Sequence, residues 1–179
     1  MNTECEVRVL DIDVSEIVDK LNEIGAKKIG EYDQKRYVYN VVPGQYGKFI
    51  RLRTNGEKTT LTYKEKLYTS MSSTKELEME IEDFSKAHMF LKAVGFNEDK
   101  YIENKRIIFV DGDVEFDIDC YPMIPPYIEI EAPNEDIVNA YIEKLGLSSH
   151  EATVGSLKSI YNRYNIDFEK IKEVKFQED

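Results

Sequence analysis

The first charged motif of the chain is Glu4-Cys5-Glu6-Val7-Arg8, in which two carboxylates and a guanidinium alternate with less polar residues. Alternation at period two is typical of a β-strand and places the three charges on one face. Carboxylates at alternate positions can hold a hard cation such as Mg²⁺ or Mn²⁺, whereas a guanidinium binds phosphate oxygens. The motif therefore fits either a solvated strand face or one side of a metal–phosphate site.

Charged or polar residues occupy every second position again in later segments. These segments are Arg51-Leu52-Arg53, Lys64-Glu65-Lys66, Glu78-Met79-Glu80, Asn104-Lys105-Arg106, Glu115-Phe116-Asp117-Ile118-Asp119 and Glu129-Ile130-Glu131. Like charges on one strand face repel each other and destabilise the sheet unless something compensates. Two architectures stay open: the charged faces point to water around an apolar core, or the sheet closes with the charged faces inward and the apolar faces under helices.

The elements that must position these residues follow from the hydrophobic periodicity. Strands are expected at 3–10, 27–42, 47–55, 58–66, 75–83, 99–110, 113–120 and 127–132, and helices at 14–25, 85–95, 135–146 and 153–165. Asn55-Gly56 and Asp111-Gly112 predict hairpin turns. About eight strands joined by short turns favour an antiparallel sheet, which can close into a barrel with room for side chains or one small ligand.

Composition narrows the class of protein. The chain has 179 residues, of which 41% are hydrophobic and 33% charged, and these values predict one globular domain. The stretch from Asp167 is polar, so the domain is expected over residues 1–166 with a polar tail over 167–179. The net charge of −11 argues against nucleic acid or an anionic membrane as the main partner. Cys5 and Cys120 suggest neither a disulfide framework nor a zinc site. Without a long apolar run or a signal-peptide pattern, the expected location is the cytoplasm.

Taken in order, the charged motifs resemble the CYTH family, named for a class of adenylyl cyclases and thiamine triphosphatase and also called the triphosphate tunnel metalloenzymes. The opening motif is similar to the family's E-x-E-x-K, and the match extends over about residues 2–165. The resemblance implies an α+β fold, in which an eight-stranded antiparallel β-barrel forms a tunnel with a charged interior and helices pack outside. It also implies a triphosphate bound inside and a divalent metal, Mg²⁺ or Mn²⁺.

The resemblance also implies roles for individual residues. The metal ligands would be Glu4, Glu6, Asp119, Glu129 and Glu131. The phosphate-binding cations would be Arg8, Arg51, Arg53, Lys64 and Arg106. The catalytic residues would be Lys64, Glu129 and Glu131, with Glu78 and Glu80 shaping the tunnel and Lys66 and Lys158 as weaker candidates.

Two positions depart from the family pattern. Arg8 stands where the family has lysine, which keeps the charge but removes a group able to shuttle a proton. The lysine of the family's K-x-R motif falls on Asn104, and alternation would turn Lys105 outward. One phosphate contact is therefore expected to be missing at this place.

Three functions remain open at the level of sequence. Hydrolysis of an inorganic or organic triphosphate is favoured, and conversion of ATP to cyclic AMP and pyrophosphate is the alternative in the same tunnel. A polyphosphate-binding module without catalysis is less favoured, because a pure phosphate binder gains nothing from so many carboxylates without metal. The expected partner is a small triphosphate such as tripolyphosphate, ATP or thiamine triphosphate. The sequence leaves a homodimer undecided, since no specific dimer interface can be recognised in it.

Overall fold

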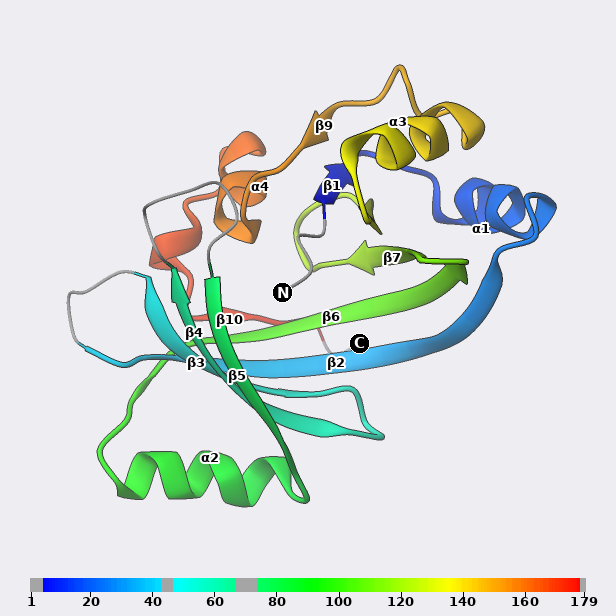
Figure 1. The fold of residues 1–179 in the computed structure, drawn as a ribbon. Coiled ribbons are helices and arrows are strands. Elements are labelled where there is room, and N and C mark those ends of the chain that lie inside the picture. Colours follow the sequence, from blue (N-terminus) through cyan, green and yellow to red (C-terminus); the bar gives the residue numbers. More distant parts are fainter. Residues whose placement is uncertain (1–4, 43–46, 67–73, 178–179) are drawn as a thin grey trace. The chain divides into compact units, whose positions relative to one another are not determined.

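The computed structural model describes residues 5–42, 47–66 and 74–177, which form two compact units (Figure 1). Unit 1 combines Met1–Tyr32 with Lys105–Glu169, and unit 2 combines Asp33–Asn104 with Lys170–Asp179. Two long strands, β2 (Lys27–Asn40) and β6 (Glu98–Asp111), contribute residues to both units. Each unit contains a sheet whose apolar face is covered by helix.

The sheet of unit 1 has the strand order β6-β7-β8-β1-β9, with every described ladder antiparallel. Besides β6, the strands of this sheet are β1 (Cys5–Val9), β7 (Val114–Cys120), β8 (Tyr127–Ala132) and β9 (Ala152–Thr153). The helices that accompany it are α1 (Val14–Glu23), α3 (Glu135–Lys144), α4 (Leu157–Arg163) and the 3₁₀ turn η1 (Phe168–Lys170). Phe116, Ile118 and Ile130 are fully buried in one apolar cluster with Leu21 of α1 and Val138 of α3. The helices therefore pack on the apolar face of this sheet.

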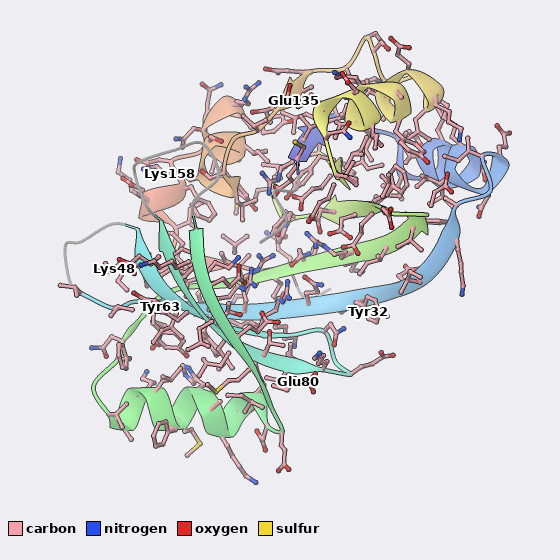
Figure 2. The ribbon with its side chains drawn as sticks, in the orientation of Figure 1. Tyr32, Lys48, Tyr63, Glu80, Glu135 and Lys158 are labelled. Atoms are coloured by element: carbon pink, nitrogen blue, oxygen red, sulfur yellow. The ribbon has the colours of Figure 1, made fainter. Side chains whose placement is uncertain are left out.

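The sheet of unit 2 has the order β5-β4-β3-β2-β6, and a further short strand pairs with β6 in parallel. The strands other than β2 and β6 are β3 (Lys48–Thr54), β4 (Thr59–Lys66), β5 (Thr74–Ile81) and the short β10 (Glu173–Val174). The helix of this unit is α2 (Phe84–Ala93). Tyr39 and Leu52 are fully buried against Leu91 of α2, which lies along one face of these strands in Figure 1. Tyr63, labelled in Figure 2, pairs with Ile50 and belongs to the same apolar face.

Local interactions explain where the elements begin and turn. The helices α1, α2 and α3 begin after Asp13, Asp83 and Asn134, whose side chains each accept a hydrogen bond from the backbone N–H three residues later. Both predicted hairpin turns place glycine at positive φ, +90° at Gly56 and +61° at Gly112, which other residues adopt with strain. The turns fix the register that aligns the charged residues across neighbouring strands.

The predicted α+β architecture of an antiparallel sheet with four α-helices is confirmed within the described residues. The predicted closed barrel describes the sheet only roughly, because the strand order of the described residues has two ends, β5 and β9. The last helix begins at Leu157 rather than at 153, because Ala152 and Thr153 pair with β1 and Ser156 caps the helix. The domain boundary after residue 166 stays a prediction. No helix in the described ranges is long and apolar enough to cross a membrane.

Candidate functional site

The face of unit 2 that points away from its apolar cluster carries a group of positive charges. Arg36 of β2 lies directly opposite Arg53 of β3, and Arg51 lies two residues from Arg53 on the same side of the strand. Lys64 of β4 follows on this face, since Arg51 pairs with Thr62 and Lys64 lies two residues further along. We call these four residues the cation cluster. Like charges this close in a sheet destabilise it unless an anion compensates.

Carboxylates of β5 border the cation cluster on one side. Glu76 Oε2 lies 3.0 Å from Lys64 Nζ, and Glu76 and Glu78 lie at the longer distances of 3.8 and 3.7 Å from Arg51 Nη2. Glu78 also accepts a 2.6 Å hydrogen bond from the hydroxyl of Thr62. Glu80, labelled in Figure 2, pairs instead with Lys58 beside the turn. Among the residues that the structure describes, no carboxylate makes a close, bidentate contact with Arg51.

The pKa values of the cluster reflect an excess of positive charge. Burial, followed by repulsion from Arg53 and Arg36, lowers the pKa of Arg51 to about 10. Burial and the neighbouring Arg51 likewise lower the pKa of Lys64. The hydrogen bond from Thr62 and the nearby cations hold the pKa of Glu78 below its usual value. An anion that arrived at this face would favour the charged forms of Arg51 and Lys64, so the cluster is suited to phosphate.

In unit 1, the sheet face that points away from the apolar cluster carries carboxylates. Glu6, Glu131 and Glu115 occupy directly opposed positions on β1, β8 and β7. In the next row Arg8 lies opposite Glu129, which lies opposite Asp117. Three acids side by side in one row are unfavourable unless a cation joins them. Arg8, which contacts Glu6, supplies one positive charge to this row.

Two arginines hold the remaining acids of this face. Arg106 donates from Nε and Nη2 to the two oxygens of Asp119, at 2.9 and 2.5 Å, and also contacts Asp117. Arg8 contacts Glu6, lies 2.7 Å from Glu129 Oε2, and donates a 2.7 Å hydrogen bond to the carbonyl oxygen of Gly155. Both side chains belong to ion-pair networks within unit 1, so their predicted contacts with phosphate stay predictions.

Glu129 is an acid of this face whose pKa is strongly shifted. It is only 9% exposed, and burial raises the pKa of its carboxyl to about 7, although Arg8 acts in the opposite direction. A carboxyl with this pKa exists in both protonation states near neutral pH. Glu129 can therefore accept or release a proton under ordinary conditions.

The donor set of unit 1 fits a hard divalent cation by its chemistry, since every candidate ligand is a carboxylate oxygen. Glu6, Glu131 and Glu115 lie in one row, and Asp119 and Glu129 lie on the same face. Within the ranges that the structure describes, no group of three or more acids, histidines or cysteines is positioned to hold a metal ion. The metal assignments accordingly stay predictions, and Glu4 lies outside the described residues.

The predicted site residues thus fall into two sets. Unit 2 brings together Arg51, Arg53, Lys64 and Glu78, whereas unit 1 brings together Glu6, Arg8, Arg106, Asp119, Glu129 and Glu131. Lys158 pairs with Glu169, and the side chain of Lys66 lies outside the described residues. Sequence reasoning missed Arg36 and Glu76 as members of the unit 2 site. Alternation could have placed Glu76 with Glu78, but the doublet Lys35-Arg36 does not reveal which residue faces the cluster.

Solved structures share this arrangement of strands and helices. The PH1012 protein from Pyrococcus horikoshii OT3 has a TM-score of 0.71 and 24% identity, covering 88% of this chain and 98% of its own. A candidate adenylate cyclase from Vibrio parahaemolyticus has a TM-score of 0.69 and 16% identity, covering 90% and 98%. The chain has their fold. The predicted CYTH resemblance is therefore confirmed at the level of the fold.

A third similar structure carries a functional description. HpAC1 from Hippeastrum, a candidate adenylyl cyclase described as having a dominant triphosphatase activity, has a TM-score of 0.63 and 15% identity, covering 95% of this chain and 99% of its own. Neither a protein-family model nor a curated protein matches the sequence. The comparisons with solved structures therefore bear on fold, and activity has to be argued from the residues.

Proposed function

We propose that this protein is a divalent-metal-dependent enzyme of the CYTH family that hydrolyses a small triphosphate. The observation that carries the proposal is the cation cluster of unit 2, in which burial and repulsion from neighbouring arginines together lower the pKa of Arg51. Such a cluster is costly in the free protein and becomes favourable when a polyanion binds. Unit 1 separately supplies carboxylates of the kind that bind a divalent cation, and a triphosphate is normally handled together with such a cation.

The chemistry of the proposed reaction is mainly positioning and charge neutralisation. Arg51, Arg53 and Lys64 would bind phosphate oxygens and hold the chain of phosphates in one orientation. Lys64, charged beside the bound phosphates, would be the candidate that donates a proton to the leaving phosphate.

The acids of unit 1 would serve the metal. Asp119, Glu129 and Glu131 would hold one Mg²⁺ or Mn²⁺, and Glu4 and Glu6 are the candidate ligands of a second cation. When bound, the cation would neutralise phosphate charge and lower the pKa of water. Glu129 and Glu131 would also orient the attacking water.

Adenylate cyclisation is the second candidate, and it is favoured by one observation. The Vibrio parahaemolyticus protein, which covers 90% of this chain in the structural comparison, is described as an adenylate cyclase candidate. Both reactions need phosphate-binding cations and a metal, and they differ in the nucleophile. Water attacks a terminal phosphorus in hydrolysis, whereas the ribose 3′-hydroxyl of ATP attacks the α-phosphorus in cyclisation.

One assay separates the two reactions. Purified protein is incubated with Mg²⁺ or Mn²⁺ and, separately, with tripolyphosphate, ATP or thiamine triphosphate. Free phosphate from tripolyphosphate or thiamine triphosphate is the expected product, and a chelator should abolish it. Formation of cyclic AMP and pyrophosphate from ATP would show that the reaction is cyclisation and not hydrolysis. Binding of every substrate without any product would contradict both reactions.

Variants of the carboxylate row test the assignment of the metal-side residues. Glu6→Gln and Glu131→Gln keep the shape of the side chain and remove its charge, so kcat should fall at least about a hundredfold. Glu57→Gln is the matched control, because Glu57 lies exposed in the turn between β3 and β4. Wild-type activity in Glu6→Gln and Glu131→Gln would show that the site lies elsewhere.

A further inference from the structure

Two threonines of β4 on the charged face of unit 2 have equivalent neighbours but different hydrogen bonds. Thr62 lies directly opposite Glu78 of β5, and its hydroxyl donates a 2.6 Å hydrogen bond to that carboxylate. Thr60 lies directly opposite Glu80 of the same strand, but the carboxylate of Glu80 contacts Lys58. The acid that would correspond to Glu78 is therefore engaged elsewhere.

The hydroxyl of Thr60 is buried and has no hydrogen-bond partner among the residues that the structure describes. Thr60 is only 5% exposed, so its burial is not compensated by open solvent. Other donors of this face do have acceptors: Nη2 of Arg36 donates a 2.6 Å hydrogen bond to Oδ1 of Asn104, and Nζ of Lys64 lies 3.0 Å from Oε2 of Glu76. A buried hydroxyl without a partner is unfavourable and calls for an explanation.

A second buried donor without an acceptor lies on the same face. Nε of Arg51 has no hydrogen-bond partner in the described part of the chain. Arg51 pairs with Thr62 and Arg53 pairs with Thr60 in the register of β3 and β4, so Arg51 and Thr60 are diagonal neighbours. Such neighbours lie about 7–8 Å apart, which is short enough for one chain of phosphates to contact both.

The charges around Thr60 select an anionic acceptor. Arg53 lies directly opposite Thr60, and Arg51 and Lys64 lie on the same face. A hydroxyl can donate to many kinds of oxygen, but one placed among cations meets a negatively charged oxygen most favourably. A phosphate group carries several such oxygens, so it can accept from the hydroxyl and from a guanidinium at the same time.

We infer that Thr60 is a phosphate-binding residue, whose hydroxyl donates a hydrogen bond to an oxygen of the bound phosphate chain. The inference rests on the proposed function for the nature of the ligand. It adds an uncharged donor to the cation cluster and explains why this hydroxyl is left without a partner in the protein alone. Because the oxygen of Thr60 is covered there, a neighbouring side chain has to move when the phosphate enters.

The first test measures binding of tripolyphosphate by calorimetry, with a chelator present to prevent the metal-dependent reaction. Thr60→Val replaces the hydroxyl by a methyl group and should weaken binding about tenfold, because a hydrogen bond to a charged oxygen is lost. Thr60→Ser keeps the hydroxyl and should retain most of the affinity. Thr59→Val is the matched control, because Thr59 is the next residue, is similarly buried and lies on the opposite face of β4. It should bind like the wild type.

The second test measures stability without tripolyphosphate by urea unfolding. Thr60→Val should unfold at the same urea concentration as the wild type or at a higher one, because the substitution removes a buried hydroxyl that makes no hydrogen bond. Thr62→Val should unfold at a lower concentration, since it breaks the hydrogen bond to Glu78. A merely structural role for the hydroxyl of Thr60 predicts the opposite pattern, with lowered stability and unchanged affinity.

The outcomes distinguish this inference from the proposed function. Wild-type affinity in folded Thr60→Val, or an equal loss of affinity in Thr59→Val, would overturn the inference and leave the proposed reaction standing. If Thr60→Val does not fold, Thr60→Ala decides by the same criterion. A wild-type protein that binds tripolyphosphate without hydrolysing it would overturn the proposed reaction and leave the inference standing. A wild-type protein that does not bind tripolyphosphate would overturn both.

Discussion

Burial and neighbouring charges decide what single arginines of the two charged faces can do. The side chains of Arg51 and Arg106 are almost equally buried, at 16% and 15% exposed. Burial and repulsion from Arg53 and Arg36 together lower the pKa of Arg51. The pKa of Arg106 is raised, because Asp119 and Asp117 contact its guanidinium and outweigh its burial. Arg106 has two carboxylates in close contact, whereas the carboxylates paired with Arg51 lie at the longer distances of 3.7 and 3.8 Å. An arriving polyanion therefore gains most at Arg51 and its neighbours.

Glu129 predicts a dependence of stability on pH. The raised pKa of about 7 means that the folded protein binds a proton that the unfolded chain, with an ordinary glutamate, releases. The folded state is therefore favoured below the ordinary glutamate pKa, and this contribution is lost as the pH rises toward 7. The loss should total about 3 kcal/mol. Urea unfolding of the metal-free protein at several pH values between about 4.5 and 8 measures how the free energy of unfolding changes with pH.

Glu129→Gln isolates this contribution from other titrating groups. The variant cannot ionise at this position, so its stability should fall less between these pH values than that of the wild type. Glu57→Gln, a change in an exposed turn, should keep the wild-type dependence. Identical pH profiles for Glu129→Gln and the wild type would show that Glu129 ionises normally in the folded protein.

At the scale of elements, alternation determines both the core and the charged faces. Leu52 is fully buried against α2, while Arg51 and Arg53 on either side of it point to the opposite face. The same strand therefore supplies an anchor for the sheet and two members of the cation cluster. Loss of the anchor would loosen the geometry of both arginines.

Leu52→Ala should destabilise the protein strongly. Removing a fully buried leucine side chain costs about 2–5 kcal/mol, depending on how far the cavity collapses. Leu77→Ala is the matched control, because Leu77 is 63% exposed on β5 and its loss should stay within about 0.5 kcal/mol. Urea unfolding measures both. Equal losses for the two variants would contradict the packing of β3 on α2.

Periodicity predicted most elements because each strand has one apolar and one charged face. The expected strand at 127–132 agrees with β8, and the expected turn at Asn55-Gly56 joins β3 to β4. The short strands β9 and β10 were not predicted, because two residues give no period to read. The pairing of Arg36 with Asn104 was also out of reach, since it depends on which strand lies beside β6. Charge motifs alone identify candidates and leave their partners undefined.

At the scale of the whole molecule, a strongly negative protein carries a local positive face. The net charge is −11, while Arg36, Arg51, Arg53 and Lys64 lie together in unit 2. Long-range forces therefore repel extended polyanions, and screening in salt solution confines the attraction of the cluster to short distances. A compact triphosphate suits such a surface better than a nucleic acid does.

The protein should accordingly not bind nucleic acid. A duplex DNA of mixed sequence, mixed with micromolar protein at physiological salt, should migrate unchanged in a gel-shift experiment, because phosphate contacts of an extended duplex require a basic surface. Tripolyphosphate should bind under the same conditions. A retarded DNA band that disappears when tripolyphosphate is added would show that the cluster accepts nucleic acid after all.

The order of the strands along the chain has a consequence for synthesis on the ribosome. Strands β3, β4 and β5 follow one another and pair as hairpins, so they can assemble as soon as they emerge. Val7 of β1, in contrast, pairs with Ile130 of β8 and must wait until most of the polypeptide has been made. During this delay an early segment with exposed apolar side chains has no partner. Exposed apolar surface and an unpaired strand edge of this kind make a nascent chain prone to aggregation.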